Sequence, residues 1–238
     1  MAVNLRKIRT VIDINQLKNR LVVSCQPVTD GPMDHVDIVV AMAKSAEAAG
    51  ASAVRIEGVE NVRQVANNLH IPIIGIVKRD LDDFPVRITP FIADITALAG
   101  AGADIVAFDA TRRARPVAVE ELYQHARRLG LRVMADCATL DDGINAAALG
   151  CDFIGSTLSG YTAETADQPM HRPDLELIGA LAKRGCRVMA EGRIREPAQA
   201  AAALQAGAFA VTVGSAITRI EHITGWYRSA LDDAAKRG

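Results

Sequence analysis

The chain carries one pattern twice near its C-terminus, in Val188-Met189-Ala190-Glu191-Gly192-Arg193 and again in Val211-Thr212-Val213-Gly214-Ser215. Each segment is an apolar run too short for a helix, which stops at a glycine and continues into residues that suit a helix. In a (β/α)₈ barrel, the loops after strands seven and eight and a nearby helix N-terminus present converging backbone N–H groups that bind phosphate. The two segments therefore predict such a barrel and a phosphorylated small-molecule ligand.

Eight apolar runs recur along the chain in alternation with helical segments. They begin near Leu21, Ala51, Ile73, Asp104, Arg132, Asp152, Arg187 and Ala208. Helical periodicity lies between them, notably over Val36–Ala49, Thr89–Ala99, Val119–Leu129, Leu140–Leu149, Leu175–Lys183 and Pro197–Gln205. Eight β-α units in series favour an α/β protein with a closed (β/α)₈ TIM barrel over an open sheet.

Glycines mark the ends of the predicted helices. The position after a helix often needs a left-handed residue, and glycine occupies it before a strand at Gly50, Gly102, Gly130, Gly150, Gly185 and Gly207. We predict an extra N-terminal helix over Val11–Arg20, which closes the bottom of the barrel, and a last helix over Trp226–Lys236. No linker-like tract divides the sequence, so residues 1–238 are predicted to form a single barrel domain.

The composition is that of an ordinary globular protein. Half of the 238 residues are apolar, and 27 basic side chains balance 28 acidic ones. This balance gives no electrostatic reason to expect nucleic acid or an anionic membrane as a partner. Residues 1–9 lack the apolar centre of a signal peptide, and no apolar run is long enough to span a bilayer, so we expect a cytoplasmic protein.

Cysteine and histidine show no spacing typical of a metal site. The cysteines lack a CxxC pair and are expected to be reduced core residues, and the histidines show no HxH or HExxH spacing. These residues are Cys25, Cys137, Cys151 and Cys186, and His35, His70, His125, His171 and His222. A structural metal is therefore not expected.

Polar residues follow each predicted strand. In strand order they are Gln26, Arg55 and Glu57, Lys78, Asp109, Asp136, Ser156 and Thr157, Glu191, and Gly214-Ser215. Because the carboxyl ends of barrel strands meet at one mouth, where barrel enzymes carry their chemistry, we expect these groups to form a ring around it.

Lys78 and Glu191 are the main candidates for acid–base chemistry. Lys78 ends an apolar run, where desolvation lowers the pKa of an amine toward the range of a general base; the alternative is a surface lysine paired with Asp80. Glu191 lies opposite strand three in a ring of eight, so its carboxylate would face or orient Lys78; the alternative is a capping or loop salt bridge. Gly192 beside it leaves space for a ligand to approach the backbone.

Two further charged residues each have two possible roles. Asp136 would serve as an acid or base, or accept a hydrogen bond from a substrate hydroxyl. Arg55 would hold an oxyanion, and equally would pair with a neighbour such as Glu57.

Five motifs between Ser24 and Tyr227 occur together in order. They are Gly75-Ile76-Val77-Lys78-Arg79-Asp80, Asp136-Cys137-Ala138-Thr139, Gly155-Ser156-Thr157-Leu158-Ser159-Gly160-Tyr161-Thr162, Ala190-Glu191-Gly192-Arg193 and Val211-Thr212-Val213-Gly214-Ser215-Ala216-Ile217-Thr218-Arg219. On these motifs the chain closely resembles the N-acetylmannosamine-6-phosphate 2-epimerases of bacterial sialic acid catabolism, a family of (β/α)₈ barrels of the ribulose-phosphate-binding type. Ala138 replaces a common serine, and Asp109–Pro116 carries an alanine where a polar residue or proline is common, which affects only fine substrate preference.

The resemblance implies an isomerase that interconverts N-acetylmannosamine 6-phosphate and N-acetylglucosamine 6-phosphate by moving the proton at C2. It implies no redox cofactor, no required metal, and a homodimer. It places the catalytic groups on Lys78, Glu191 and Asp136, the substrate-binding side chains on Gln26, Arg55 and Arg219, and the phosphate on the backbone around Gly192, Arg193, Gly214 and Ser215.

A proton transfer through an enolate fits this ring of groups. The C2 proton lies α to the C1 aldehyde once the sugar ring is open, so neutral Lys78 would remove it while Glu191 tunes or relays the charge. Arg55 would stabilise the enolate oxygen, and Asp136 would assist ring opening or hold sugar hydroxyls. A single lysine that serves both faces is favoured over a pair of bases.

Two other functions stay open. A phosphate-binding barrel in which Lys78 forms a Schiff base, as in class I aldolases, would use the same strand-end lysine. A non-catalytic barrel that only binds a sugar phosphate would share the fold.

Overall fold

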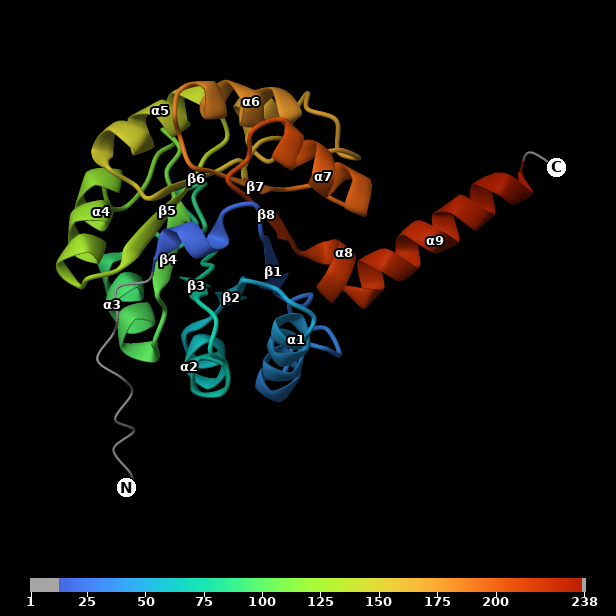
Figure 1. The fold of residues 1–238 in the computed structure, drawn as a ribbon, viewed down its shortest axis with the longest axis horizontal. Helices are drawn as coiled ribbons and strands as arrows, with labels where there is room; N and C mark the ends of the chain where they lie inside the picture. The colour runs from blue at the N-terminus through green and yellow to red at the C-terminus, as the bar shows by residue number, and fades with distance from the viewer. Residues whose placement is uncertain (1–12, 237–238) are drawn as a thin grey trace.

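Eight parallel strands close into a barrel in the computed structural model, which describes residues 13–236 (Figure 1). They are β1 (Leu21–Cys25), β2 (Ala53–Glu57), β3 (Ile73–Ile76), β4 (Ile105–Asp109), β5 (Arg132–Asp136), β6 (Phe153–Gly155), β7 (Val188–Glu191) and β8 (Ala210–Val213). Each strand pairs with the next in sequence, and β8 pairs with β1. The predicted (β/α)₈ barrel is confirmed, and every strand begins within two residues of its predicted start. A single domain over all of 1–238 stays a prediction.

Strand residues alternate between the inside of the barrel and the surrounding helices. The inner cluster is formed by Val22, Ala53, Ile74, Ile76, Ile105, Ala107, Met134, Phe153, Met189 and Ala210. A larger cluster lies between the strands and the helices, and includes Val54, Ile56, Phe108 and Ile154. The inner cluster fills the amino side of the barrel. Further toward the carboxyl ends of the strands, the inward side chains are polar: Arg55, Asp136, Glu191 and Thr212. The inward polar side chains therefore gather at the carboxyl ends.

The predicted helices largely form as expected. Three have the predicted bounds and two end one residue early: α5 (Leu140–Leu149), α6 (Leu175–Lys183) and α7 (Pro197–Gln205), and α1 (Val36–Ala48) and α4 (Val119–Arg128). All six glycines that were expected to end helices have a positive φ, between 74° and 107°.

Two helices differ from the prediction. Helix α2 (Val59–Asn68) follows from the eight predicted β-α units, but its bounds were not predicted; Val62 and Val65 give it a buried face. Helix α3 (Ile92–Ala101) begins three residues later than expected. Thr89 has a left-handed φ of 47° and precedes a proline, whose ring disfavours helical geometry in the residue before it.

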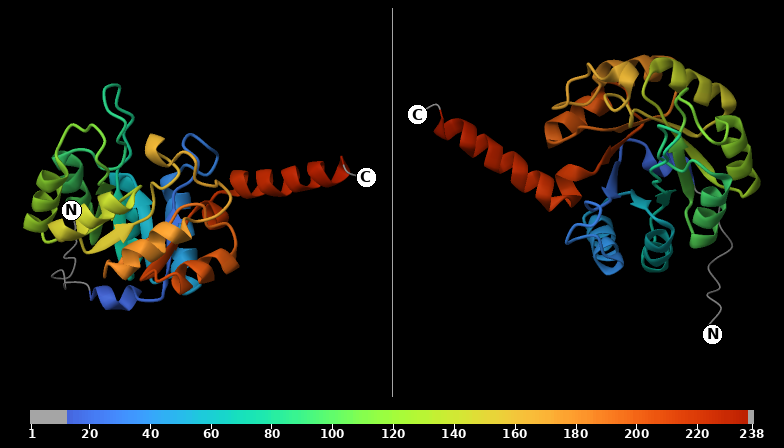
Figure 2. Two further views of the ribbon diagram at one scale, coloured as in Figure 1. Left: turned by 90° about the horizontal axis from the view of Figure 1, so that it is seen from above. Right: turned by 180° about the vertical axis from the view of Figure 1, so that it is seen from behind.

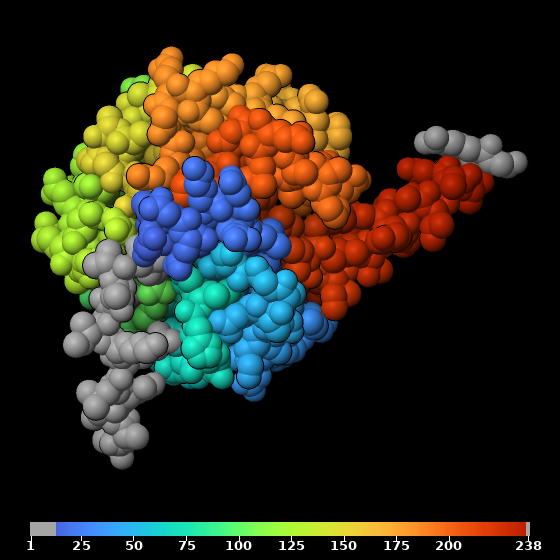
Figure 3. All heavy atoms as spheres, viewed as in Figure 1, coloured from blue at the N-terminus to red at the C-terminus, as the bar shows by residue number. Residues whose placement is uncertain are grey.

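The predicted N-terminal helix is mostly absent from the described residues. Only the four-residue 3₁₀ helix η1 (Ile14–Leu17) forms, with Asp13 accepting a hydrogen bond from the Asn15 N–H, while Val11 and Ile12 lie outside the described range. Leu17 is fully buried against the inner cluster, and Figure 3 shows this segment in blue across the centre of the barrel. The segment therefore closes the amino end of the barrel, as expected for the longer helix.

The C-terminal helix α9 (Ile220–Ala235) follows the short helix α8 (Ser215–Thr218) and begins six residues before the predicted start. It extends away from the barrel as an arm (Figures 1 and 2). No residue of α9 is buried, and Ile220, Tyr227 and Leu231 are exposed. Among the described helices, none combines the length and apolar character needed to cross a membrane.

Candidate active site

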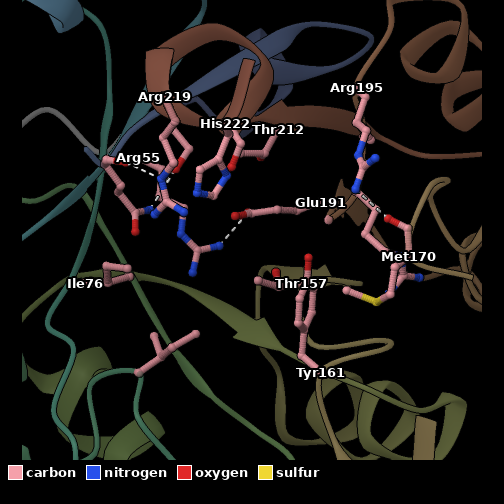
Figure 4. Close-up of a pocket in the computed structure, with 18 of the residues that line it drawn as sticks. Arg55, Ile76, Thr157, Tyr161, Met170, Glu191, Arg195, Thr212, Arg219 and His222 are labelled. Atoms are coloured by element: carbon pink, nitrogen blue, oxygen red, sulfur yellow. Dashed lines mark hydrogen bonds and ion pairs between the residues drawn. The ribbon is translucent and has the colours of Figure 1, made fainter. Parts of the chain in front are cut away.

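A cavity of about 410 Å³ opens at the carboxyl ends of the strands (Figure 4). Nine of the ten predicted site residues line it: Gln26, Arg55, Lys78, Glu191, Gly192, Arg193, Gly214, Ser215 and Arg219. The tenth, Asp136, lies behind this lining. Residues far apart in the sequence thus meet in one cavity because the closed barrel brings the strand ends together.

The guanidinium of Arg55 links two carboxylates inside the barrel. It projects inward from the middle of β2, is fully buried, and donates to Asp136 Oδ1 and Oδ2 at 3.1 and 2.6 Å. The same Arg55 Nη1 donates to Glu191 Oε2 at 2.5 Å. Arg55 therefore pairs with two carboxylates across the barrel, and the alternative partner Glu57 does not contact it.

Burial and the pairing with Arg55 have opposite effects on the pKa of Glu191. Loss of solvation raises the pKa of the Glu191 carboxyl above its usual range, while the nearby Arg55 and Lys78 charges oppose that rise. Asp136 adds to the rise because it is a second carboxylate close by. Glu191 therefore holds a proton more readily than an exposed glutamate does.

Lys78 follows β3 and presents an unpaired amine to the cavity. Its backbone N–H contacts Glu57 Oε1 at 3.4 Å, but its Nζ has no hydrogen bond or ion pair within residues 13–236. Burial, followed by the charges of Arg219 and Arg55, lowers the pKa of the Lys78 amine to about 8. The surface alternative is not realised, because Asp80 pairs with Arg87 instead. An amine with this pKa is partly neutral near pH 7 and can accept a proton.

Asp136 lies at the carboxyl end of β5, as predicted, but outside the lining of the cavity, and its role as an acid or base stays a prediction. It has no exposed surface and both oxygens bind Arg55, while Oδ1 also accepts from the Thr157 hydroxyl at 2.6 Å. Its oxygens are thus occupied by protein donors. This geometry fits a residue that orients Arg55 and Thr157.

Gln26 and Arg219 form the wall of the cavity beside β1. The Gln26 amide donates to Ser24 Oγ at 2.7 Å, and Arg219 Nε donates to the Gln26 carbonyl at 2.8 Å. In the described part of the chain, the terminal guanidinium nitrogens of Arg219 have no protein partner, so they are free to bind a ligand oxygen.

The two glycine loops from the end of β7 and β8 face the same cavity. Gly192 has a φ of 107°, and a Cβ on it would come within 3.5 Å of the Thr157 carbonyl. Gly214 packs so closely on β1 that a Cβ would approach the Ser24 Cβ to 3.3 Å. Both positions therefore favour a residue without a side chain, which leaves the backbone open to a ligand.

The side chain of Arg193 is engaged elsewhere. Its Nε donates to the Arg172 carbonyl at 2.9 Å, and its Nη1 donates to the Ser159 carbonyl. Arg193 thereby braces the long loop between β6 and α6, and its contribution to a bound anion would come from the backbone.

Several residues of the cavity were not singled out as site residues by the sequence. They are Ser24, Ile76, Ile88, Thr157, Tyr161, Met170, Ile194, Arg195, Thr212, His222 and Trp226. Thr157 had a usable signal, since it follows a predicted strand. His222 and Trp226 had none, because they lie on α9 and reach the cavity only through its placement; Arg195 stacks over Trp226 at 4.7 Å.

The charges in the cavity favour an anionic ligand. The lining includes one acidic side chain, Glu191, and several basic ones, among them Arg55, Lys78, Arg195 and Arg219. No group of three or more potential metal ligands is gathered anywhere in residues 13–236. The prediction that the reaction needs no metal or cofactor stays a prediction.

Known proteins resemble the chain over most of its length. The "Putative N-acetylmannosamine-6-phosphate 2-epimerase" of Proteus mirabilis (strain HI4320) is 58% identical over 219 residues, covering 92% of this chain and 93% of that protein. The protein of the same description from Salmonella agona (strain SL483) is 59% identical over 215 residues, covering 90% and 93%.

Solved structures agree with the sequence relatives. The N-acetylmannosamine-6-phosphate 2-epimerase from Clostridium perfringens superposes with a TM-score of 0.87 at 36% identity, covering 91% of this chain and 95% of that one. Thiamine phosphate pyrophosphorylase from Pyrococcus furiosus, at 18% identity and a TM-score of 0.57 over 86% and 88% of the two chains, shares the fold alone.

The family resemblance expected from the five motifs is confirmed. A family model described as "NanE: Putative N-acetylmannosamine-6-phosphate epimerase" matches residues 39–233, which is most of the barrel and of α9. The chain therefore belongs to the NanE family of N-acetylmannosamine-6-phosphate epimerases.

Proposed function

We propose that the protein is an N-acetylmannosamine-6-phosphate 2-epimerase, which interconverts N-acetylmannosamine 6-phosphate and N-acetylglucosamine 6-phosphate by moving the proton at C2. The observation that carries the proposal is the unpaired Lys78 amine, with its pKa lowered to about 8, in a cationic cavity that also holds Glu191. Family membership supports the substrate, since relatives of the same description cover more than nine tenths of the chain.

The reaction begins on the open-chain sugar. The C1 aldehyde makes the C2 proton acidic, so Lys78 Nζ takes that proton while the C2–H electrons form the C1=C2 double bond and the carbonyl π electrons move to the C1 oxygen, which gives an enolate. The planar enolate then turns so that the other face of C2 meets Lys78, and return of the proton to that face gives the other epimer and restores the neutral amine. We assign both transfers to Lys78, because it is the lysine that lines the described cavity.

Glu191 and Arg219 act on the charge of the intermediate. The Glu191 carboxylate offsets the ammonium that forms on Lys78, and Arg55 fixes its position through the 2.5 Å contact. The free terminal nitrogens of Arg219 are suited to the enolate oxygen or a sugar hydroxyl. Arg55 is a positioning residue in this scheme, because it donates three hydrogen bonds to Asp136 and Glu191.

The phosphate occupies the two glycine loops. Backbone N–H groups around Gly192, Arg193, Gly214 and Ser215 would bind its oxygens, in the position that barrels commonly use for phosphate. Binding energy from this remote group holds C2 near Lys78 without itself changing in the reaction.

Proton NMR of N-acetylmannosamine 6-phosphate with the protein in deuterated water tests the function. We expect N-acetylglucosamine 6-phosphate to appear with deuterium at C2, in a reaction that needs no added metal or cofactor. Lack of product would refute the function, and borohydride trapping of substrate on Lys78 would favour the Schiff-base aldolase instead.

A cytoplasmic homodimer completes the proposal. Helix α9 presents Ile220, Tyr227 and Leu231 to solvent and extends beyond the barrel, so a second copy of the chain offers the surface that covers it. Sedimentation equilibrium should give twice the chain mass, and Tyr227→Ser with Leu231→Ser should lower it to one chain. Monomeric behaviour of the unaltered protein would refute the dimer.

A further inference from the structure

A short segment of the loop between β3 and α3 is inserted between the ends of two barrel strands. β3 and β4 pair directly only through Ile74 with Ile105 and Gly75 with Val106. Beyond these pairs, residues 87–89 fill the gap. Ile88 bridges Lys78 in antiparallel fashion, and its carbonyl accepts from the Asp109 N–H at 3.0 Å. Figure 2 shows the loop rising from the mouth of the barrel, on the side opposite η1.

Thr89 anchors this inserted segment through three hydrogen bonds. The Val77 N–H donates to Thr89 Oγ1 at 3.2 Å, and the Thr89 N–H donates to the Val77 carbonyl at 2.7 Å. The Thr89 hydroxyl donates to the Ala107 carbonyl of β4 at 2.7 Å. Thr89 has no exposed surface, so these buried bonds join Val77, the residue before Lys78, to Ala107 of β4.

The backbone of Thr89 is strained. Its φ of 47° lies in the left-handed region, where a β-branched side chain is an outlier. Glycine or asparagine would adopt this conformation more easily, but glycine has no hydroxyl to bond both strands. Strain of this kind persists where the surrounding structure holds it, and it clusters at functional sites.

The inserted segment holds the backbone on both sides of Lys78. Its neighbour Val77 is bonded to Thr89, its neighbour Arg79 donates to the Arg87 carbonyl at 2.9 Å, and Lys78 itself bridges Ile88. Ile88 is buried and lines the cavity beside Lys78. The inserted segment therefore fixes the backbone from which the Lys78 side chain projects. Ile88 lies on one side of that side chain.

We propose that Thr89 is a positioning residue of the epimerase, which holds Lys78 at C2 of the substrate and keeps water from its amine. The proposal rests on the proposed function for the role of Lys78 as base. Thr89 touches no substrate in this scheme and acts only through the backbone of β3 and the placement of Ile88.

The charged groups around Lys78 come from several elements and also from the loop that Thr89 holds. Those that act on its amine are Arg55 and Glu57 from β2, Glu191 from β7, Arg219 before α9, and Asp80 and Arg87 from its own loop. Because Thr89 is itself uncharged, its replacement changes the solvation and placement of the amine without removing any of these charges.

The test compares Thr89→Val, Thr89→Gly and Thr89→Ser, with Thr139→Val as the matched control. Thr139 Oγ1 accepts from the Asp142 N–H at 3.2 Å at the start of α5, so its loss also removes a threonine hydrogen bond, away from Lys78. The pKa of Lys78 is measured by carbon-13 NMR of reductively methylated protein, with the signal assigned by its loss in Lys78→Arg. Epimerase kinetics and thermal unfolding are measured on the unmethylated variants.

We expect Thr89→Val and Thr89→Gly to raise the pKa of Lys78 by about one unit toward its ordinary value, because water reaches the amine. kcat should fall on the order of tenfold or more, with little change in KM, because the base is displaced. Thr89→Ser should retain both properties. Thr89→Gly relieves the left-handed strain, so it should recover stability relative to Thr89→Val without recovering kcat.

A merely structural role predicts a different result. The proposal is overturned if the pKa of Lys78 and kcat in Thr89→Gly match the unaltered protein, or if kcat follows the unfolding temperature through all variants, Thr139→Val included. The proposal is also overturned if the pKa of Lys78 rises while kcat stays the same, because the placement of Lys78 would then not matter to the reaction. Failure of the unaltered protein to epimerise rejects the proposed function alone.

Discussion

Arg55 and Asp136 form a bidentate ion pair across the barrel, with N···O distances of 3.1 and 2.6 Å and almost no exposure to solvent. Strands β2 and β5 are not neighbours, so the pair spans the barrel interior beneath the cavity. Both groups are charged and buried, which makes each depend on the other.

Asp136→Asn should lower the free energy of unfolding by about 3–5 kcal/mol, because it leaves the Arg55 charge buried with one carboxylate instead of two. Urea unfolding measures the change. Asp80→Asn, which alters an exposed pair with Arg87, serves as the control and should leave stability unchanged within error. Equal stability of Asp136→Asn and the unaltered protein would contradict a structural role for the pair.

Lys78→Ala should abolish exchange of the C2 proton with deuterated water, since the described cavity offers no other unpaired amine at this position. Binding of N-acetylglucosamine 6-phosphate, followed by calorimetry, should persist because the phosphate loops are unchanged. Exchange near the rate of the unaltered protein would remove Lys78 from the base role.

The pH dependence of kcat/KM should show a limb governed by Lys78. The active form is the neutral amine, so kcat/KM should rise with pH up to about 8, the pKa of Lys78, and then level off. Glu57 opposes the lowering of that pKa, so Glu57→Gln should move the limb to lower pH. A limb that does not move in Glu57→Gln would indicate another titrating group.

Lys78→Met should stabilise the protein at pH 7. The pKa of Lys78 is about 8 in the folded protein and about 10.4 in an unfolded chain, so between these values the unfolded state binds more protons. The buried ammonium costs on the order of 3 kcal/mol below pH 8, and this cost disappears as the pH rises toward 10.4. Urea unfolding at pH 7 and pH 10 tests the difference, with Lys44→Met on the exposed side of α1 as control. The same gain at both pH values would contradict this origin.

Arg193→Ala should raise KM on the order of tenfold with a small change in kcat, because the β6–α6 loop loses its brace to the Arg172 and Ser159 carbonyls. Steady-state kinetics measure both constants. Arg112→Ala, on the exposed β4–α4 loop, is the control. A large fall in kcat at constant KM would indicate a contact made only in the transition state.

Local sequence signals predicted the frame of the molecule well. Buried parallel strands read as short apolar runs, and glycines such as Gly102 and Gly150 mark helix ends because their φ must be positive. The register of the barrel then brings the strand-end residues together, which is why Lys78 and Glu191 were found.

The partners of those residues were not predictable in the same way. The choice of Asp136 over Glu57 as the partner of Arg55 depends on which side chains point inward at the same height, and no local pattern encodes it. The conformation of Thr89 overrides a helical periodicity, and His222 reaches the cavity only because α9 leaves the barrel at that angle. Each of these features is set by tertiary packing.

In the described residues, Leu17 and the inner cluster fill the amino side of the barrel, and the cavity lies at the carboxyl ends of the strands. Both epimers carry the same phosphate, so the proposed phosphate site would bind reactant and product alike. The two sugars would therefore compete for the same cavity. The enzyme therefore sets no direction for the reaction. Net conversion in a cell depends on which of the two epimers is consumed by later reactions.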